Sequence, residues 1–378
     1  MSTGSATFVE VNQARRWRAF DWQLLLYLVV LIGFGLVIGY SANYQSAGVA
    51  NGLPQTLKTL VWTVIGLALF FVAARVDYHW LQTFAAPIYL LVIALLVATV
   101  LVGRTLFGAQ MSISIGGLDF QFSEISKVLM IVVLAAFLAS RGERVGRLST
   151  IVGAGLLVAA PTILVYRQPD LGTALVFVAI LLGMLFMSGA GIGWLAMLGG
   201  VAIAAAPFAV GALQAYQRQR LFCFLNPSSD PQGACYQLVQ ALNAVGSGGL
   251  LGHGLTAGRL NQLGFLPVQS TDFIFTVVAE ELGFVGGAIL LALFALLVWR
   301  VVRIGWGARD TLGRSLAAGL ASMLLFQIGV NIGMVTGIMP VTGIPLPLIT
   351  YGGSSMISLL FGLGILQSVR MHAEKPTF

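Results

Sequence analysis

Charged residues are scarce in this sequence. Only 9% of its 378 residues are Asp, Glu, Lys or Arg, whereas 58% are hydrophobic. A soluble globular domain carries about 25% charged residues, because its surface must stay in contact with water. The composition therefore excludes an ordinary soluble protein and predicts an integral membrane protein.

Cysteine and clustered positive charge are also lacking. The two cysteines, Cys223 and Cys235, are too few for a disulfide-rich scaffold and too far apart for a CxxC motif. The net charge is +7, but the 20 Lys and Arg residues are scattered over short loops and form no basic stripe. This pattern argues against a nucleic-acid partner and indicates that the charges set membrane topology.

Hydrophobic runs recur along the whole chain, and a helix needs roughly 20 such residues to cross a membrane. Membrane barrels show only weak alternation over about ten residues. We therefore predict an all-α polytopic membrane protein with about ten transmembrane helices and a long external loop between the seventh and eighth spans. The predicted spans are 23–40, 58–76, 84–103, 124–140, 151–166, 171–188, 192–213, 273–299, 316–338 and 353–369.

Most basic residues fall on one side of these spans. Cytoplasmic loops of membrane proteins are enriched in Lys and Arg, so this side is predicted to be cytoplasmic, together with both termini. Segments 1–22 and 371–378 then flank a single transmembrane domain over 23–370, whose extracytoplasmic loop covers 214–272. The residues on the basic side are Arg15, Arg16, Arg18, Arg75, Arg141, Arg144, Arg147, Arg300, Arg303, Arg309, Arg314, Arg370 and Lys375.

Most glycines and prolines outside the spans lie in the external segments. Irregular backbone at membrane depth is tolerated only where it is buried in protein or lines a cavity. We therefore predict re-entrant segments around an external cavity. The two most marked are NAVGSGGLLGHGL (243–255) and MPVTGIPLPLITYGGSS (339–355).

Charged side chains inside spans are costly to bury and mark either function or pairing. Glu124 and Lys127 lie on one helical face, three residues apart, at the outer end of the fourth span. One interpretation is an ion pair that compensates its own burial and fixes the helix. The other places both groups in a water-filled cavity, and the two roles are compatible.

Asp272 stands where the long external loop meets the eighth predicted span. It could be the N-cap of that helix. Alternatively, a carboxylate at the mouth of a membrane cavity is partly desolvated, which raises its pKa toward the range of a general base. Glu280 and Glu281 lie two to three turns deeper in the predicted span and point in different directions, so we interpret them as helix-packing or inner-cavity groups.

Three external arginines, Arg167, Arg218 and Arg220, suit phosphate oxygens, because the guanidinium fork donates two parallel hydrogen bonds. A basic face resting on lipid headgroups is the alternative. In the same RQPD turn as Arg167, Pro169 favours a helix break and Asp170 can cap the following helix.

Histidine clusters are excluded by number. Of His79, His253 and His372, only His253 is external on this topology, which argues against a zinc site and a Ser-His-Asp triad. Carboxylates therefore offer the best material for acid-base chemistry. A hard cation such as Mg²⁺ could join a carboxylate to a pyrophosphate, although the sequence does not indicate which residues would ligate it.

Four segments together resemble the SEDS family (shape, elongation, division and sporulation proteins), and the similarity covers essentially the whole chain. Val341, Ile344 and Pro345 look like the rod-elongation (RodA) branch, since the division (FtsW) branch usually reads more like PTTGLTLPL. The segments are RQPDLGTALV at 167–176, FLNPSSDPQGACYQLVQALNAVGSGGLLGHG at 224–254, TDFIFTVVAEELGFVGG at 271–287 and TGIMPVTGIPLPLITYGGSS at 336–355.

The resemblance implies a peptidoglycan glycosyltransferase that polymerises lipid II at the outer face of the bacterial cytoplasmic membrane during cell elongation. It implies a class B penicillin-binding protein and other elongation-complex membrane proteins as partners. Asp272 matches the family's essential aspartate and would take the proton from the acceptor sugar 4-hydroxyl as undecaprenyl pyrophosphate leaves. Glu124 and Lys127 match the charged pair of the QPSExxK motif. With Arg167, Arg218 and Arg220 they are predicted to bind substrate, Mg²⁺ or Mn²⁺ could assist, and no organic cofactor is expected.

The sequence departs from the family pattern at three places. Where the family usually has GAxRW, residues 108–112 read GAQMS, so Met111 and Ser112 replace an Arg-Trp pair. Phe122 stands for the proline of QPSE, and Ser270 for a histidine frequent before TDF. A septal FtsW-like polymerase, a lipid II flippase and a weakly active scaffold for a penicillin-binding protein remain alternatives.

Cys223 and Cys235 flank the FLNPSSDPQGA turn on the side that faces an oxidising compartment in this topology. A disulfide between them is a hypothesis, because so short a loop can be closed but its geometry is not known from sequence.

Overall fold

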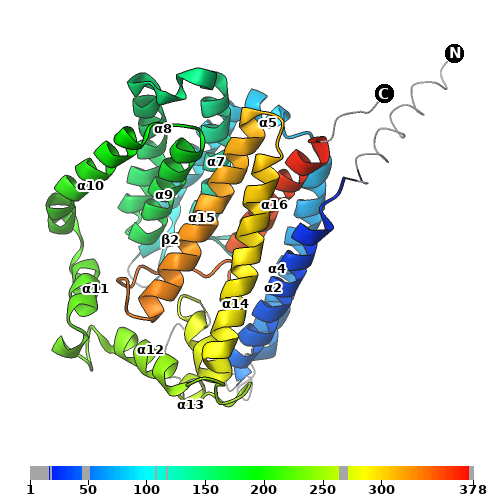
Figure 1. Cartoon of the computed structure of the whole chain (residues 1–378). Coiled ribbons are helices and arrows are strands. Elements are labelled where there is room, and N and C mark those ends of the chain that lie inside the picture. The colour runs from blue at the N-terminus through cyan, green and yellow to red at the C-terminus, as the bar shows by residue number, and fades with distance from the viewer. Residues whose placement is uncertain are drawn as a thin grey trace.

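The computed structural model describes residues 17, 19–44, 52–106, 109–115, 118–263 and 271–373, which form a helical bundle (Figure 1). Its long helices are α2 (Trp22–Ala42), α4 (Gly52–Arg75), α6 (Ala85–Val102), α7 (Phe122–Arg141), α8 (Leu148–Arg167), α9 (Leu171–Met187), α10 (Ile192–Ala212), α14 (Ile274–Trp306), α15 (Thr311–Val335) and α16 (Gly353–His372). Shorter elements are α5 (Trp80–Thr83), η1 (Gly142–Gly146), α11 (Ala215–Leu225), η2 (Pro227–Ser229), α12 (Tyr236–Ser247) and α13 (Arg259–Gln262).

The predicted polytopic helical fold is confirmed. Eight of the described helices are long and apolar enough to cross a membrane, namely α2, α4 from Gln55, α6, α7, α8, α14, α15 and α16. Helix α9 and the apolar stretch Ile192–Val201 of α10 are shorter, and they occupy the sixth and seventh predicted spans. The chain is therefore a multi-pass membrane protein.

A small antiparallel sheet, which composition did not predict, joins α6 to α7. Its strands are β1 (Arg104–Leu106), β2 (Ala109–Ile115) and β3 (Leu118–Phe120), in the order β1-β2-β3. It fills most of the predicted external segment 104–123. Met111 and Ser112 lie on β2, whereas Gly108 lies outside the described residues.

Helices α7, α15 and α16 form the most buried part of the bundle. Glycines allow them to approach their neighbours closely. A Cβ on Gly364 would lie 2.5 Å from the Phe70 carbonyl oxygen, so α16 packs directly against the backbone of α4. A Cβ on Gly319 would lie 2.5 Å from Ile131 Cγ2, which brings α15 onto α7.

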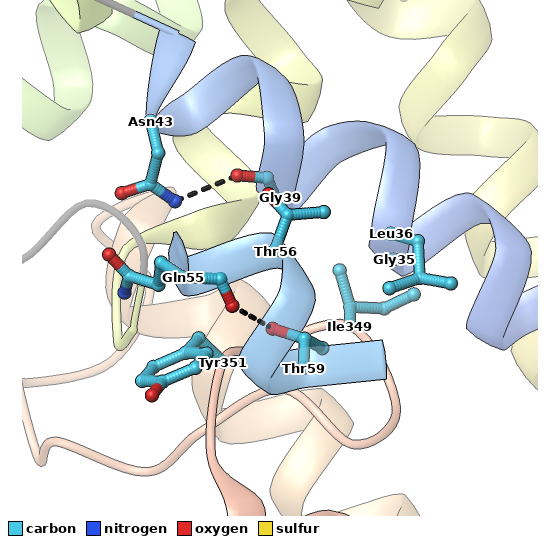
Figure 2. Close-up of a pocket in the computed structure, with 9 residues that line it drawn as sticks. All are labelled: Gly35, Leu36, Gly39, Asn43, Gln55, Thr56, Thr59, Ile349 and Tyr351. Carbon is cyan, nitrogen blue, oxygen red and sulfur yellow. Dashed lines mark hydrogen bonds between the residues drawn. The ribbon is translucent and has the colours of Figure 1, made fainter. Parts of the chain in front are cut away.

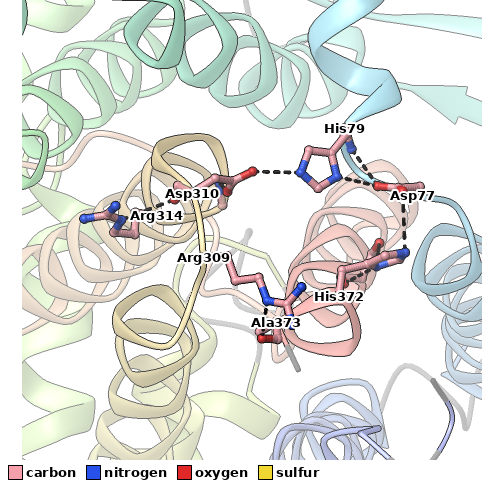
Figure 3. A network of polar contacts seen from close by, with 9 residues as sticks. Asp77, His79, Arg309, Asp310, Arg314, His372 and Ala373 are labelled. Atoms are coloured by element: carbon pink, nitrogen blue, oxygen red, sulfur yellow. Dashed lines mark hydrogen bonds and ion pairs between the residues drawn. The ribbon is translucent and has the colours of Figure 1, made fainter. Parts of the chain in front are cut away.

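The bundle has two different ends, visible in Figure 1 as the ends that carry α5 and α13. We call the α5 end the inner end and the α13 end the outer end. At the inner end Arg300 forms an ion pair with Asp21 at 2.7 Å. His79 contacts Asp310 at 2.8 Å and Asp77 at 2.7 Å (Figure 3). Several arginines that we predicted to be cytoplasmic also lie at this end. They are in the last turns of α4, α7, α14 and α16 and in η1. The assignment of this end to the cytoplasm remains a prediction.

Helix α14 is two helices joined by a reversal, not the single crossing over 273–299 that we predicted. Gly283 has φ +66° and ψ −164°, a conformation that is strained for any residue with a Cβ. A Cβ on Gly287 would lie 3.4 Å from the ring of Phe275, although twelve residues of straight helix would separate them by about 18 Å. The short arm (274–282) therefore folds back on the long arm (284–306).

The reversal changes the place of two acidic residues. We expected Glu280 and Glu281 to lie deeper than Asp272 in a continuous span. Instead they stand at the end of the short arm beside the reversal, against the segment predicted to be re-entrant. His253 N donates to Glu280 O at 3.1 Å and Gly254 N to Glu281 O at 2.9 Å. These bonds satisfy carbonyls that the broken helix cannot pair.

The same segment also pairs the amides beyond the reversal. Phe284 N donates to Gly249 O at 2.9 Å, and Val285 N donates to Leu250 O at 3.1 Å. Gly252 is required for this approach, because its φ is +74° and a Cβ there would lie 2.2 Å from Glu281 O. The glycines of 248–254 thus allow an irregular loop to complete the hydrogen bonding of a broken helix.

Candidate active site

Asp272 immediately precedes the short arm of α14 and does not cap it. The N-cap is Phe273, and no side chain makes the capping hydrogen bond, so the N-cap interpretation of Asp272 was wrong. The carboxylate points instead toward Gly343 and Arg220. A Cβ on Gly343 would lie 3.3 Å from Asp272 Oδ2 and 3.9 Å from a terminal nitrogen of Arg220. Gly343, at φ +73°, leaves the space that these two charged groups share.

The environment of Asp272 favours its protonated form more than water does. Burial raises the pKa of Asp272 to about 6, the Arg220 guanidinium opposes this rise, and the charges of Asp170 and Glu124 add to it. No hydrogen bond or ion pair joins Asp272 to Arg220, although both side chains are described. The carboxylate is therefore close to a cation but not neutralised by direct contact, as a general base requires.

Backbone contacts hold Asp272 in place. Asn331, fully buried in α15, donates from Nδ2 to Asp272 O at 2.9 Å and to Ile344 O at 2.7 Å. Thr350 Oγ1 donates to Thr271 O at 3.2 Å and accepts from Leu346 N at 2.8 Å. These bonds tie the start of the short arm to the 339–355 segment. Sequence reasoning missed Asn331, although an amide within an apolar span was a visible signal.

Glu124 and Lys127 form the predicted ion pair. Lys127 Nζ lies 2.7 Å from Glu124 Oε1, and the two side chains are only 2% and 4% exposed. The pair occupies the first turns of α7, whose first residue is Phe122. Its charges reach the neighbouring carboxylates, since Glu124 acts on Asp272 and both members of the pair act on Asp170.

Asp170 caps α9, as predicted, and also lies beside this pair. Its Oδ1 accepts from Thr173 N at 2.9 Å. Burial raises the pKa of Asp170, while the hydrogen bonds from Thr173 and the charge of Lys127 oppose the rise. We predicted only the capping role. The start of α9 packs on the 339–355 segment at Gly172, where a Cβ would lie 2.7 Å from Thr342 O.

Of the three predicted anion-binding arginines, the structure brings Arg220 to Asp272. Arg220 lies on α11, with its guanidinium 5.7 Å from the ring centre of Tyr216. Tyr216 in turn donates to Pro169 O at 3.0 Å, which docks α11 on the turn before α9. Arg218 donates to Gly211 O at 3.0 Å and supports the end of α10, and Arg167 is exposed at the end of α8. Roles for Arg218 and Arg167 in substrate binding remain predictions.

Cys223 and Cys235 form a disulfide, which confirms that hypothesis. Their Cα atoms lie 5.2 Å apart, and the bond ties α11 to the start of α12. The helix that carries Arg220 is therefore covalently fixed. Ser270, the departure just before Thr271, lies outside the described residues.

We also searched the described part of the chain for a metal site and for a substrate pocket between α2 and α4. Among its residues, no group of three or more His, Cys, Asp or Glu side chains could hold a metal ion. The pocket between α2, α4 and residues 349–351 has Asn43, Gln55 and Thr59 on its wall (Figure 2). Its volume of about 10 Å³ suits one water molecule and no sugar.

Comparison with known proteins identifies the family of this chain. The family model described as "Cell cycle protein" (FtsW/RodA/SpoVE) matches residues 22–375. The chain belongs to the FtsW/RodA/SpoVE family. This is the SEDS family that the four sequence segments indicated.

Members of this family are similar over almost the whole chain. Peptidoglycan glycosyltransferase MrdB of Escherichia coli K12 is 40% identical, with 94% of each chain covered. Among solved structures, a chain of a peptidoglycan synthase complex has a TM-score of 0.78 at 32% identity, covering 93% of this chain and 97% of that chain. RodA of Thermus thermophilus has a TM-score of 0.71 at 30% identity, covering 95% and 99%.

Proposed function

We propose that this protein is a peptidoglycan glycosyltransferase that polymerises lipid II into glycan strands at the outer face of the cytoplasmic membrane during cell elongation. The observation that carries the proposal is the setting of Asp272, a partly buried carboxylate held beside Arg220 at the outer side of a membrane bundle. The activity named for MrdB, a relative along nearly the full chain, supports it.

Asp272 acts as the general base in this proposal. With a pKa of about 6, it is ionised at neutral pH and close enough to that pH to accept a proton. It takes the proton from the acceptor sugar 4-hydroxyl as that oxygen attacks the anomeric carbon of the donor. The configuration inverts, and undecaprenyl pyrophosphate leaves.

Positive charge is needed where the pyrophosphate departs. In this proposal Arg220 stabilises an anion near Asp272. The charges of Lys127 and Glu124 on α7 contribute to the electrostatic potential at the same site. A divalent cation, Mg²⁺ or Mn²⁺, would neutralise further charge on the pyrophosphate when bound. Because Mg²⁺ is held largely by substrate phosphates in many such sites, the cation would arrive with the substrate.

The proposal places both termini in the cytoplasm and the outer end in the extracytoplasmic space. The basic inner end supports this orientation. It also includes a class B penicillin-binding protein as partner, which the structural similarity to a chain of a peptidoglycan synthase complex supports.

The deciding experiment is polymerisation of purified lipid II in the presence of Mg²⁺ or Mn²⁺, with and without the cognate class B penicillin-binding protein. We expect glycan ladders from the wild type and at least about a 100-fold loss for Asp272→Asn, which removes the base but retains the size of the side chain. Unchanged melting temperature would show that the variant folds. Ladders from Asp272→Asn at the wild-type rate would refute the base assignment. No ladders from either folded protein would favour a scaffold or a flippase.

A further inference from the structure

An open pocket of about 490 Å³ lies at the outer end, at the opposite end of the short arm from Asp272. Its walls come from three segments that the short arm brings together. The lining residues are Ser247, His253, Arg259, Leu260 and Glu280. None of them takes part in the proposed chemistry.

The pocket wall is held rigidly by Glu280. The Glu280 carboxylate accepts from Leu260 N at 2.7 Å and from Asn261 N at 3.1 Å. A Cβ on Gly258 would lie 3.0 Å from the Glu280 carboxyl carbon, so only glycine lets α13 approach so closely. The Glu280 carboxylate is thus hydrogen-bonded to the α13 backbone, and no ion pair joins it to a cation that the structure describes.

Two nitrogen-bearing side chains remain available in the pocket. His253 and Arg259 are both exposed, and neither side chain has a hydrogen bond or ion pair with any residue that the structure describes. The backbone of His253 is nevertheless fixed, because its N–H donates to Glu280 O at 3.1 Å. A pocket in which a guanidinium and an imidazole make no ion pair with a described residue suits an anionic ligand, and a carboxylate matches the guanidinium fork.

The distance to Asp272 indicates which anion can reach the pocket. Glu280 is eight residues from Asp272, or about 12 Å along a helix. That is comparable to the length of one disaccharide unit, so a peptide attached to a sugar near Asp272 can extend to the pocket. We propose that this pocket binds a free carboxylate of the stem peptide on the lipid-linked substrate or growing glycan. The inference rests on the proposed function and adds a substrate determinant to it.

The phosphate of an anionic lipid headgroup shares this chemistry. Leu250 and Leu251, on the loop that reaches the pocket, are 72% and 79% exposed and are suited to contact lipid. The carboxylate is favoured because the pocket is aligned with Asp272 through the short arm. The experiment must therefore separate the two anions.

The test measures binding of lipid II to the full-length Asp272→Asn protein, which cannot turn the substrate over, in neutral detergent micelles. Two forms of lipid II are compared, one with free stem-peptide carboxylates and one with those carboxylates amidated. We expect the acidic form to bind about tenfold more tightly, the gain of a charge-assisted contact. Adding Arg259→Gln should remove this difference by weakening only the acidic form, and His253→Gln should reduce it about threefold. Lys58→Gln, at an exposed cation in the second turn of α4, is the matched control and should retain it.

Three results would overturn the proposal: equal binding of the two forms, equal weakening of both by Arg259→Gln, or loss of the difference when phosphatidylglycerol is added to the micelles. The last result would assign the pocket to a lipid headgroup. Polymerisation by the wild type without carboxylate dependence would reject this pocket and leave the proposed function intact. Carboxylate-dependent binding without polymerisation would support the pocket and reject the proposed function.

Discussion

The two ends of the bundle use charge in different ways. At the inner end, charged groups pair with each other across helices. Arg300 pairs with Asp21, and His79 pairs with Asp310 (Figure 3). At the outer end, Asp272 and Arg220 approach the same glycine without bonding each other. Charges that pair with each other are satisfied within the protein, whereas charges kept apart retain the capacity to bind a substrate.

The pKa directions of two aspartates express the same contrast. Burial alone would raise the pKa of Asp77, but hydrogen bonds from the backbone and side chain of His79 hold it below its usual value. At Asp272 burial prevails, and the pKa rises to about 6. A fixed ion pair needs the first condition, and a base near neutral pH needs the second.

The Glu124–Lys127 pair of α7 is an ion pair, like those of the inner end, but it lies near Asp272. Because it is buried, its disruption should have the largest effect on stability. Lys127→Met leaves the Glu124 carboxylate buried without a partner, so we expect a loss of about 3–5 kcal/mol. Glu124→Gln combined with Lys127→Met removes both charges and should recover most of that loss. Thermal unfolding in detergent measures both.

Arg144→Met at the exposed inner end provides the control for loss of a cation and should leave the melting temperature nearly unchanged. If the double variant melts as low as Lys127→Met, the cost does not come from an uncompensated charge, and the pair stabilises α7 by some other means.

The unpaired cation at the outer end should control both rate and pH dependence. Since protonation disables a base, activity should fall as the pH decreases through the Asp272 pKa of about 6. Arg220→Gln removes the charge that opposes the pKa rise, so the acid limb of the rate profile should move to higher pH. We also expect a loss of about 100-fold at pH 8, because an anion-stabilising group is gone.

Arg218→Gln is the matched variant on the same helix and should leave the acid limb in place, whatever its effect on rate. An unmoved acid limb in Arg220→Gln would mean that Arg220 does not influence Asp272, and that their approach at Gly343 has no electrostatic consequence.

The sequence predicted several groups of the site but not how they are assembled. The spacing of Glu124 and Lys127 indicated an ion pair as one of two interpretations, and Asp170 before an apolar run predicted a cap. The approach of Arg220 to Asp272 depends on α11 docking through Tyr216 and on the disulfide, which no local pattern encodes. Gly283 was not recognisable as a reversal, because a glycine within an apolar run is also compatible with a continuous helix.

Asn331 tests whether the outer end depends on positioning as well as charge. Asn331→Leu removes the donor that joins the Asp272 and Ile344 carbonyls, so the base should be less well oriented. We expect kcat to fall about tenfold with little change in KM, since substrate contacts are retained. Gln367→Leu is the control, because this buried amide has no hydrogen-bond partner among the described residues. A rise in KM with constant kcat would place Asn331 in substrate binding instead.

The smallest effect is expected at the inner end, and it tests whether the network there is only structural. His79 is about half exposed, and its side-chain bonds to Asp77 and Asp310 are solvent-accessible. Exposed ion pairs contribute about 0–1 kcal/mol, so His79→Gln should lower stability by less than 1 kcal/mol. Its polymerisation rate and acid limb should match the wild type, because no described contact links this network to Asp272. A tenfold loss of rate with an unchanged melting temperature would show that the inner end is coupled to the outer site, and the division of roles between the ends would fail.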